Sequence, residues 1–218
     1  MFRLIGMLCL LAGSLQAGAW PRDRGTGFAS LAGRLTWPGD LSSARPELGY
    51  QTAYAEYGLT DRLTGGLDLG RSVSGDLKLI GFLRYPLRER GNWRSAVELG
   101  VGQIDGEPVL RPGLSLGRGT RNAHGYGWLS VDTVAEYGLR SKAIDWKLDA
   151  THGFALPRDR KLIVQIQTGL PAGRSAFARL APSLVFPLGK RFSAEAGLTI
   201  GLAGDSGIGM MIGLWSDF

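Results

Sequence analysis

The sequence has few residues that could build a thiol, disulfide or imidazole site. Of its 218 residues one is cysteine and two are histidine. Cys9 lies in an N-terminal segment that we expect to be removed, so the mature chain is predicted to have no thiol, disulfide or cysteine metal site. His124 and His152 are then the imidazoles available to a catalytic or metal site.

Charge is also sparse, and long apolar runs are missing. Charged residues make up 20% of the chain, and no run after the N-terminus approaches the ~20 apolar residues of a membrane-spanning helix. The formal net charge of +6 would ordinarily raise nucleic-acid binding. The basic residues are dispersed, however, and export would place the chain away from nucleic acid, so we expect no nucleic-acid partner.

The N-terminus has the three parts of a secretory signal peptide. Arg3 supplies positive charge, Leu4 to Ala12 supplies an apolar core of roughly 9 residues, and Ala17-Gly18-Ala19 supplies small residues for cleavage. This core is too short to cross a bilayer as a helix, so cleavage is expected rather than retention. The sequence predicts a signal peptide over 1–19 and one mature domain over 20–218.

The mature chain is organised as segments of roughly 10 to 12 residues that alternate apolar and polar side chains. In the segment 77–85, one parity carries Leu79 and Leu83 while the other carries Lys78 and Arg84. A period of two puts these sets on opposite faces of a strand. One face suits lipid and the other suits water, which favours a membrane barrel over the alternative of a soluble periplasmic β-sandwich.

The turn residues between these segments define the expected strands. They cover residues 26–37, 48–58, 63–72, 76–87, 93–104, 108–118, 126–139, 143–156, 161–170, 176–187, 191–202 and 207–218. An even number of strands places both ends of the chain on the periplasmic side. The predicted fold is all-β, a transmembrane antiparallel up-and-down β-barrel of about 12 strands. Pro112 and Pro182 fall inside expected strands, and each would need a bulge or a shifted boundary.

The last segment resembles the terminal recognition strand of bacterial outer-membrane β-barrels. Ile212, Leu214 and Phe218 share one parity, and the chain ends in the phenylalanine usual for that strand, although it departs from the pattern at Ser216. The segment from Tyr54 to Thr64 also looks like a strand-turn-strand unit of porin-like outer-membrane barrels. This resemblance implies a location in the bacterial outer membrane. The implied partners are outer-membrane lipids, lipopolysaccharide and the barrel-assembly machinery, with Ile212, Leu214 and Phe218 as the assembly signal.

The charged residues of the inward parity are the candidate functional residues. They are close to balanced in sign, with basic residues favouring the strands from 76 to 118 and acidic ones those from 126 to 156. The opposed charges would set up a transverse field that favours polar solutes. By parity the lumen receives Arg34, Glu56, Asp68, Lys78, Arg84, Arg94, Glu98, Arg111, Asp132, Glu136, Asp145, Lys147, Asp149, Arg179 and Glu195.

Three functions are compatible with this pattern. The first is a narrow porin-like channel for small polar solutes, because 12 strands lie between the filled eight-stranded barrel and the open 16-stranded porin. The second is a closed structural or receptor barrel, whose lumen is filled by inward-facing aromatic residues. The third is a membrane-embedded lipid hydrolase, with His124 or His152 as base and Ser130, Ser183 or Ser193 as nucleophile.

No enzymatic activity, cofactor or metal is expected from the residues. The sequence does not show whether a serine and a histidine lie within hydrogen-bond distance in the fold, so the hydrolase stays the weaker alternative. Asp145 and Asp149 alternate on one strand face in a way that could chelate calcium. The intervening Lys147 favours mutual neutralisation of these charges instead.

Overall fold

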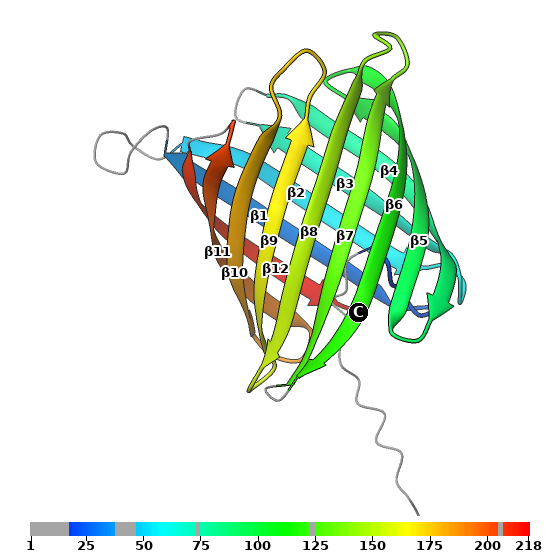
Figure 1. Ribbon diagram of the computed structural model, residues 1–218, viewed down its shortest axis with the longest axis vertical. Coiled ribbons are helices and arrows are strands. Elements are labelled where there is room, and N and C mark those ends of the chain that lie inside the picture. Colours follow the sequence, from blue (N-terminus) through cyan, green and yellow to red (C-terminus); the bar gives the residue numbers. More distant parts are fainter. Residues whose placement is uncertain (1–17, 38–46, 73–74, 123–124, 205–206) are drawn as a thin grey trace, which may run out of the picture.

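The computed structural model describes residues 18–37, 47–72, 75–122, 125–204 and 207–218. Twelve antiparallel strands form one closed barrel, in which every strand pairs with its sequence neighbours and β12 pairs with β1 (Figure 1). No helical segment in the described part of the chain has the length and apolarity required to span a membrane. The predicted fold class is confirmed.

The strands agree closely with those predicted from alternation. The largest differences are that β4 and β6 continue to Arg90 and Asn122, because ladder pairing persists beyond the apolar alternation that defined the predicted ends. The strands are β1 (Gly27–Trp37), β2 (Glu47–Gly58), β3 (Thr64–Ser72), β4 (Leu77–Arg90), β5 (Trp93–Ile104), β6 (Glu107–Asn122), β7 (Gly125–Gly138), β8 (Ile144–Leu156), β9 (Arg160–Leu170), β10 (Phe177–Pro187), β11 (Phe192–Ala203) and β12 (Ile208–Asp217).

The barrel closes between the first and last strands. The register runs from Phe28 opposite Asp217 to Trp37 opposite Ile208. Beyond the last rung, Gly27 N donates to Phe218 O at 2.6 Å and Phe218 N donates to Gly27 O at 3.0 Å. The Phe218 ring lies directly over Gly27, where even a methyl group would clash with it. A glycine at position 27 therefore leaves room for the terminal aromatic ring beside the seam.

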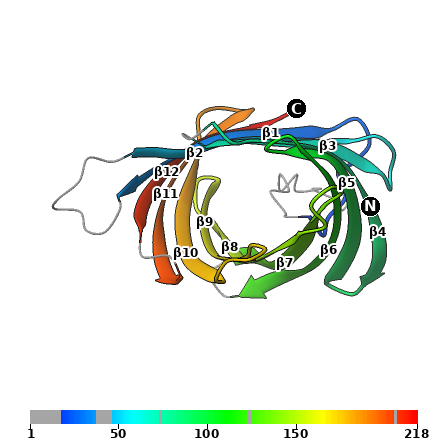
Figure 2. The same ribbon diagram turned by 90° about the horizontal axis from the view of Figure 1, so that it is seen from above.

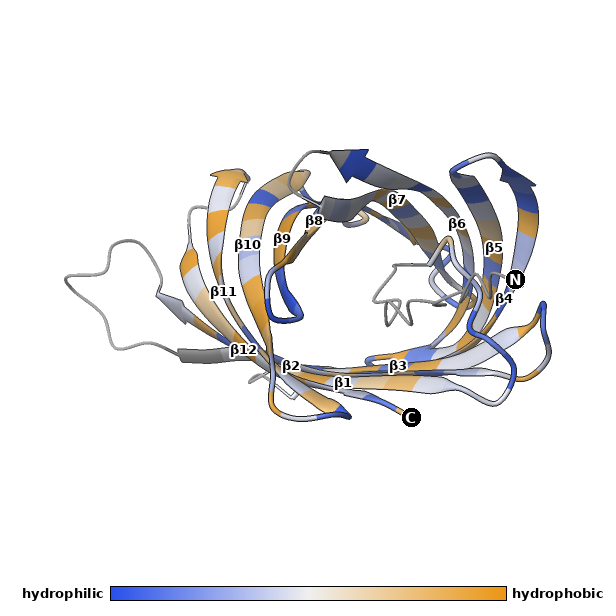
Figure 3. Ribbon diagram, turned by 90° about the horizontal axis from the view of Figure 1, so that it is seen from below, coloured by the Kyte–Doolittle hydropathy of each residue, from blue (hydrophilic) through white to orange (hydrophobic). Residues whose placement is uncertain are grey.

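The outer face of the barrel is apolar around its circumference. Leu79 is 45% exposed, whereas its neighbour Ile80 on the inner face is fully buried. Exposed aliphatic side chains recur along the other strands. The hydropathy colouring shows hydrophobic and hydrophilic positions interspersed along the ribbons (Figure 3). A soluble β-sandwich buries its apolar face between two sheets. The single closed sheet with apolar residues outside contradicts that alternative and is the arrangement of a transmembrane barrel.

The two mid-strand prolines are tolerated without a bulge or a shifted boundary, contrary to expectation. Pro112 lies inside β6 and Pro182 inside β10. Each keeps its partner on one neighbouring strand, Leu99 and Val164 respectively. On the other side the ladder loses its rungs at the proline and resumes in the same register. A missing N–H therefore costs local pairing on one side only.

Candidate functional site in the barrel lumen

The barrel encloses a central cavity of about 520 Å³. In cross-section β1, β2 and β3 form a flattened wall, and β5 to β9 curve around the opposite side (Figure 2). We call the end where β1 begins and β12 ends the terminal end, and the opposite end the loop end. The cavity extends from Arg22 and Phe28 at the terminal end to Lys78 and Gln167 farther along the barrel.

An ion-pair chain of alternating sign runs along the wall formed by β2 to β6. At its centre, Glu98 accepts from both Arg84 Nη2 and Arg111 Nη2 at 2.8 Å. Strand pairing explains part of this, since Arg84 and Glu98 are directly opposed on β4 and β5. Gly100 of β5 lies directly opposite Arg111. The absence of a side chain at Gly100 makes room for the Arg111 side chain, because a methyl group there would lie 3.3 Å from Arg111 Nε.

The chain continues in both directions from this centre. Arg84 Nη1 also binds Glu56 at 2.8 Å, and Glu56 in turn binds Arg22. In the other direction Arg111 binds Asp68, whose carboxylate is 2.8 Å from Lys78 Nζ. The complete ion-pair chain is Arg22, Glu56, Arg84, Glu98, Arg111, Asp68 and Lys78. Because every arginine in its interior is held by two carboxylates, this wall carries little unbalanced charge.

An aromatic row fills the lumen beside the ion-pair chain. Phe28 packs edge-on against Trp215 at 5.8 Å between ring centres, and Tyr54 stacks on Phe82 at 5.7 Å. Phe28 and Tyr54 are 6.4 Å apart and join the two pairs. The Arg84 guanidinium lies 5.0 Å from the Phe82 ring centre, a cation–π distance. The aromatic row and the ion-pair chain both border the central cavity, whose lining continues on β7 and β8.

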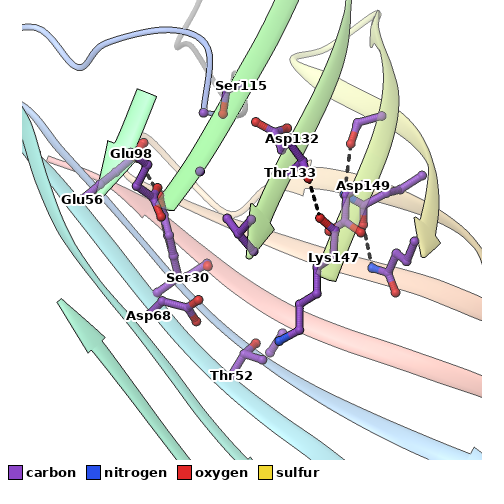
Figure 4. A pocket seen from close by; sticks show the side chains of 18 of the residues that line it. Ser30, Thr52, Glu56, Asp68, Glu98, Ser115, Asp132, Thr133, Lys147 and Asp149 are labelled. Atoms are coloured by element: carbon purple, nitrogen blue, oxygen red, sulfur yellow. Dashed lines mark hydrogen bonds between the residues drawn. The ribbon is translucent and has the colours of Figure 1, made fainter. Parts of the chain in front are cut away.

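The opposite side of the cavity is an acidic wall formed by Asp132, Glu136 and Asp149 of β7 and β8. Asp132 and Asp149 are directly opposed in the strand register (Figure 4). Lys147 Nζ binds Glu136 at 2.7 Å. Among the described residues, no cation lies within ion-pair distance of Asp132 or Asp149. Like charges directly opposite in a sheet are destabilising, so this pair calls for a neutralising group.

Near the loop end a polar contact crosses the lumen. Arg34 Nη2 of β1 donates to Gln167 Oε1 of β9 at 3.3 Å. Two further hydrogen bonds extend this network along β9 and β8. Gln167 Nε2 donates to Gln165 Oε1 at 2.6 Å, and Gln165 Nε2 donates to Thr151 Oγ1 at 3.0 Å. A smaller cavity of about 180 Å³, lined in part by Arg34 and Tyr50, lies on the loop-end side. The crossing contact stands between the two cavities.

Most of the charged residues predicted for the lumen line these cavities. Arg34 and Arg179 line the smaller one. Those lining the central cavity are Glu56, Asp68, Lys78, Arg84, Glu98, Arg111, Asp132, Glu136, Lys147, Asp149 and Glu195.

Two of the predicted residues lie at strand ends instead. Arg94 Nη1 donates to Gly91 O at 2.8 Å, and Asp145 accepts from Ala172 N at 2.7 Å. Their parity is inward, but parity does not report how far along a strand the cavity extends. Of the predicted assembly residues, Ile212 and Leu214 are exposed on the outer face of β12, and Phe218, directly after β12, is exposed as well.

Sequence reasoning missed the segment that precedes β1. Residues 18–22 lie in the lumen at the terminal end, where Ala19 is fully buried and Arg22 N donates to Thr64 Oγ1 at 3.1 Å. Arg22 also places its guanidinium 4.9 Å from the Phe28 ring centre. Alternation carries no signal for a residue outside the strands, so Arg22 could not be assigned to the lumen. The rest of the predicted signal peptide, 1–17, lies outside the described residues.

The hydrolase alternative does not assemble around His152. This side chain belongs to the outward parity of β8 and lies 3.9 Å from the Phe154 ring, measured between ring centres. Ser130, Ser183 and Ser193 belong to the inward parity of their strands. His124 lies outside the described residues. Within the described ranges, no group of three or more histidine, cysteine, aspartate or glutamate residues is arranged to hold a metal ion.

Solved structures share this architecture at low sequence identity. No protein-family model and no curated protein sequence matches the chain. The KdgM porin superposes with a TM-score of 0.62 at 8% identity, over 87% of this chain and 99% of the porin. A KdgM porin structure in complex with disordered oligogalacturonate gives 0.61 at 8% identity, with the same coverage of 87% and 99%. An outer-membrane channel from Pseudomonas putida F1 gives 0.57 at 13% identity, over 93% and 99%. The chain has the fold of porin-like outer-membrane barrels.

Proposed function

We propose that this chain is an integral protein of the bacterial outer membrane that forms a narrow channel for small polar solutes. It is exported by residues 1–19, which are removed, and residues 20–218 form the barrel. The observation that carries the channel is the central cavity, in whose lining charged and hydroxyl side chains from most strands stand beside apolar and aromatic ones. A polar lumen of this kind retains water and favours polar solutes over apolar ones.

The charges around the cavity set the direction of its field. The arginines of the ion-pair chain are held by carboxylates, whereas Asp132 and Asp149 face the cavity without a described cation. The negative potential is therefore strongest along β7 and β8. We expect a moderate preference for cationic over anionic solutes, because a carboxylate in a narrow pore attracts cations.

Contacts with the membrane follow from the outer face. The exposed aliphatic belt would lie in the hydrocarbon, with outer-membrane lipids and lipopolysaccharide around it. Ile212, Leu214 and Phe218 project from β12 on this face, where the barrel-assembly machinery could engage them during insertion.

Two measurements test the location and the channel separately. Folded barrel protein in the outer-membrane fraction should change its gel mobility on heating, because a closed barrel resists unfolding in cold detergent. Liposomes containing the purified protein should swell in isotonic solutions of small polar solutes and swell less as solute size increases. Heat-dependent mobility without swelling would contradict the channel while retaining the barrel.

A closed structural or receptor barrel is the second candidate, favoured by the crossing contact between Arg34 and Gln167. A lumen blocked there would conduct only after this contact is removed. Swelling that occurs with an Arg34→Ala variant, but not with the wild-type protein, would support this second candidate over the open channel.

A further inference from the structure

The N-terminal segment packs directly on the acidic wall. Gly18 lies so close to β7 that a methyl group on it would stand 2.6 Å from Asp132 Oδ1, and it also contacts Ser115 of β6. In Figure 4 this segment passes beside Ser115 as the blue trace. Ala19 is fully buried, and its side chain lies 2.8 Å from where a methyl group at Gly117 would stand. The backbone around Ala19 is therefore inside the lumen, next to two neighbouring inward positions of β6.

These positions lie opposite Asp132 and Ser130 in the barrel wall. Ser115 is paired with Asp132, and Gly117 is paired with Ser130. Trp20 follows Ala19 directly, and its indole lies against Gly117. Its backbone nitrogen is bonded to the buried Ala19, one residue after Gly18, which packs against Asp132 and Ser115. Asp132 Oδ1 is buried and accepts no hydrogen bond from the described residues.

The segment is anchored on its far side as well. Arg22 is bound to Glu56 and, through its backbone nitrogen, to Thr64. Farther along, Gly25 N donates to Gly58 O at 3.0 Å. These contacts follow Trp20 in the chain, so they would remain after removal of residues 1–19. They would hold Trp20 at the acidic wall.

We propose that the α-ammonium group created at Trp20 by signal-peptide removal binds Asp132 inside the lumen. The acidic wall then serves as the receptor for the chain's own N-terminus, with the Ser115 hydroxyl as a second acceptor. This supplies a cation beside the opposed carboxylates of Asp132 and Asp149. The residues from Trp20 to Arg22 form a short plug at the terminal end of the cavity. The proposal rests on the proposed removal of residues 1–19, and it does not depend on conduction.

The reactivity of the N-terminal amine tests this inference. The mature protein would be purified from outer membranes, and its intact mass would establish the first residue. Folded protein would then be treated at neutral pH with an amine-acetylating reagent, and modification of the N-terminal peptide would be followed by mass spectrometry. An adjacent carboxylate favours the protonated, unreactive amine, so Asp132→Asn should react faster by about tenfold or more. Asp132→Glu should retain slow modification.

A matched control is available on the same side of the barrel. Asp145→Asn also removes one carboxylate, but Asp145 caps Ala172 at the loop end, so this variant should react like the wild-type protein. Equal rates for wild type, Asp132→Asn and Asp145→Asn would overturn the proposal, as would a mature chain that begins at another residue. If Asp132→Asn does not fold, equal rates for folded and urea-unfolded wild-type protein would overturn it. Each of these results leaves the channel proposal intact.

Discussion

Arg34 and Gln167 come from strands on opposite walls of the barrel and are joined by a hydrogen bond of 3.3 Å across the lumen. Three strands, β10, β11 and β12, lie between β9 and β1 in the barrel, so no sheet pairing brings these side chains together. Their contact stands between the central cavity and the smaller loop-end cavity. We infer that this contact constricts the passage between the two cavities.

Shortening Arg34 should widen the passage. Arg34→Ala removes the side chain that crosses the lumen, so single-channel conductance should rise, by roughly twofold if the crossing contact is the main resistance. Planar-bilayer recording measures this change directly. Arg94→Ala is the matched control, because Arg94 lies at a strand end outside the described cavities and its removal should leave conductance unchanged. An unaltered or smaller conductance in Arg34→Ala would place the constriction elsewhere.

The ion-pair chain should contribute strongly to stability. Glu98→Ala would leave Arg84 and Arg111 without their shared carboxylate in a buried setting. Loss of one partner from a buried pair destabilises by about 3 kcal/mol or more, so the free energy of unfolding in urea should fall by that order. Glu89→Ala, which removes an exposed partner of Arg94, should cost no more than about 1 kcal/mol. Equal losses in the two variants would show that the chain is not a stabilising unit.

Charge on the acidic wall should set the ion preference. Asp149→Asn removes a carboxylate that lines the central cavity, so the reversal potential in a salt gradient should move toward anions. Asp145→Asn removes the same charge from the neighbouring part of β8 without touching the cavity, and the reversal potential should stay where it is in the wild-type protein. A shift of equal size in both variants would mean that selectivity follows net charge rather than position.

The terminal phenylalanine should matter for assembly more than for the folded seam. Phe218→Ala keeps the backbone hydrogen bonds to Gly27 and removes the exposed ring. We expect less heat-modifiable protein in the outer membrane, with near-normal refolding of the purified variant in detergent. Leu202→Ala, another exposed apolar residue at the loop end, is the control and should assemble normally. Normal outer-membrane levels of Phe218→Ala would remove Phe218 from the assembly signal.

The strands were predictable because alternation is a local signal. The period of two along 77–85 sorts Leu79 from Lys78 without any knowledge of the partner strands, and the barrel follows from repeating that pattern. The effect of the prolines was not predictable, because whether Pro112 disrupts one ladder or two depends on the neighbouring strands.

The organisation of the lumen depended on information that alternation does not contain. Parity assigned Arg84 and Glu98 to the interior, but it could not show that Arg84 is buried in an ion-pair chain. Arg84→Glu, which parity alone would suggest as a selectivity variant, should therefore impair folding. Arg22 and the crossing contact of Arg34 with Gln167 join residues far apart in the sequence, so only the closed barrel reveals them.

Conductance of the wild-type barrel is the most direct test of the channel. Protein that shows heat-dependent gel mobility, and is therefore folded, would be added to a planar lipid bilayer under an applied voltage. We predict discrete current steps that increase in the Arg34→Ala variant. In a salt gradient, the reversal potential should show that cations carry more of this current than anions. Folded protein that inserts without any current steps, in both the wild type and Arg34→Ala, would contradict the channel.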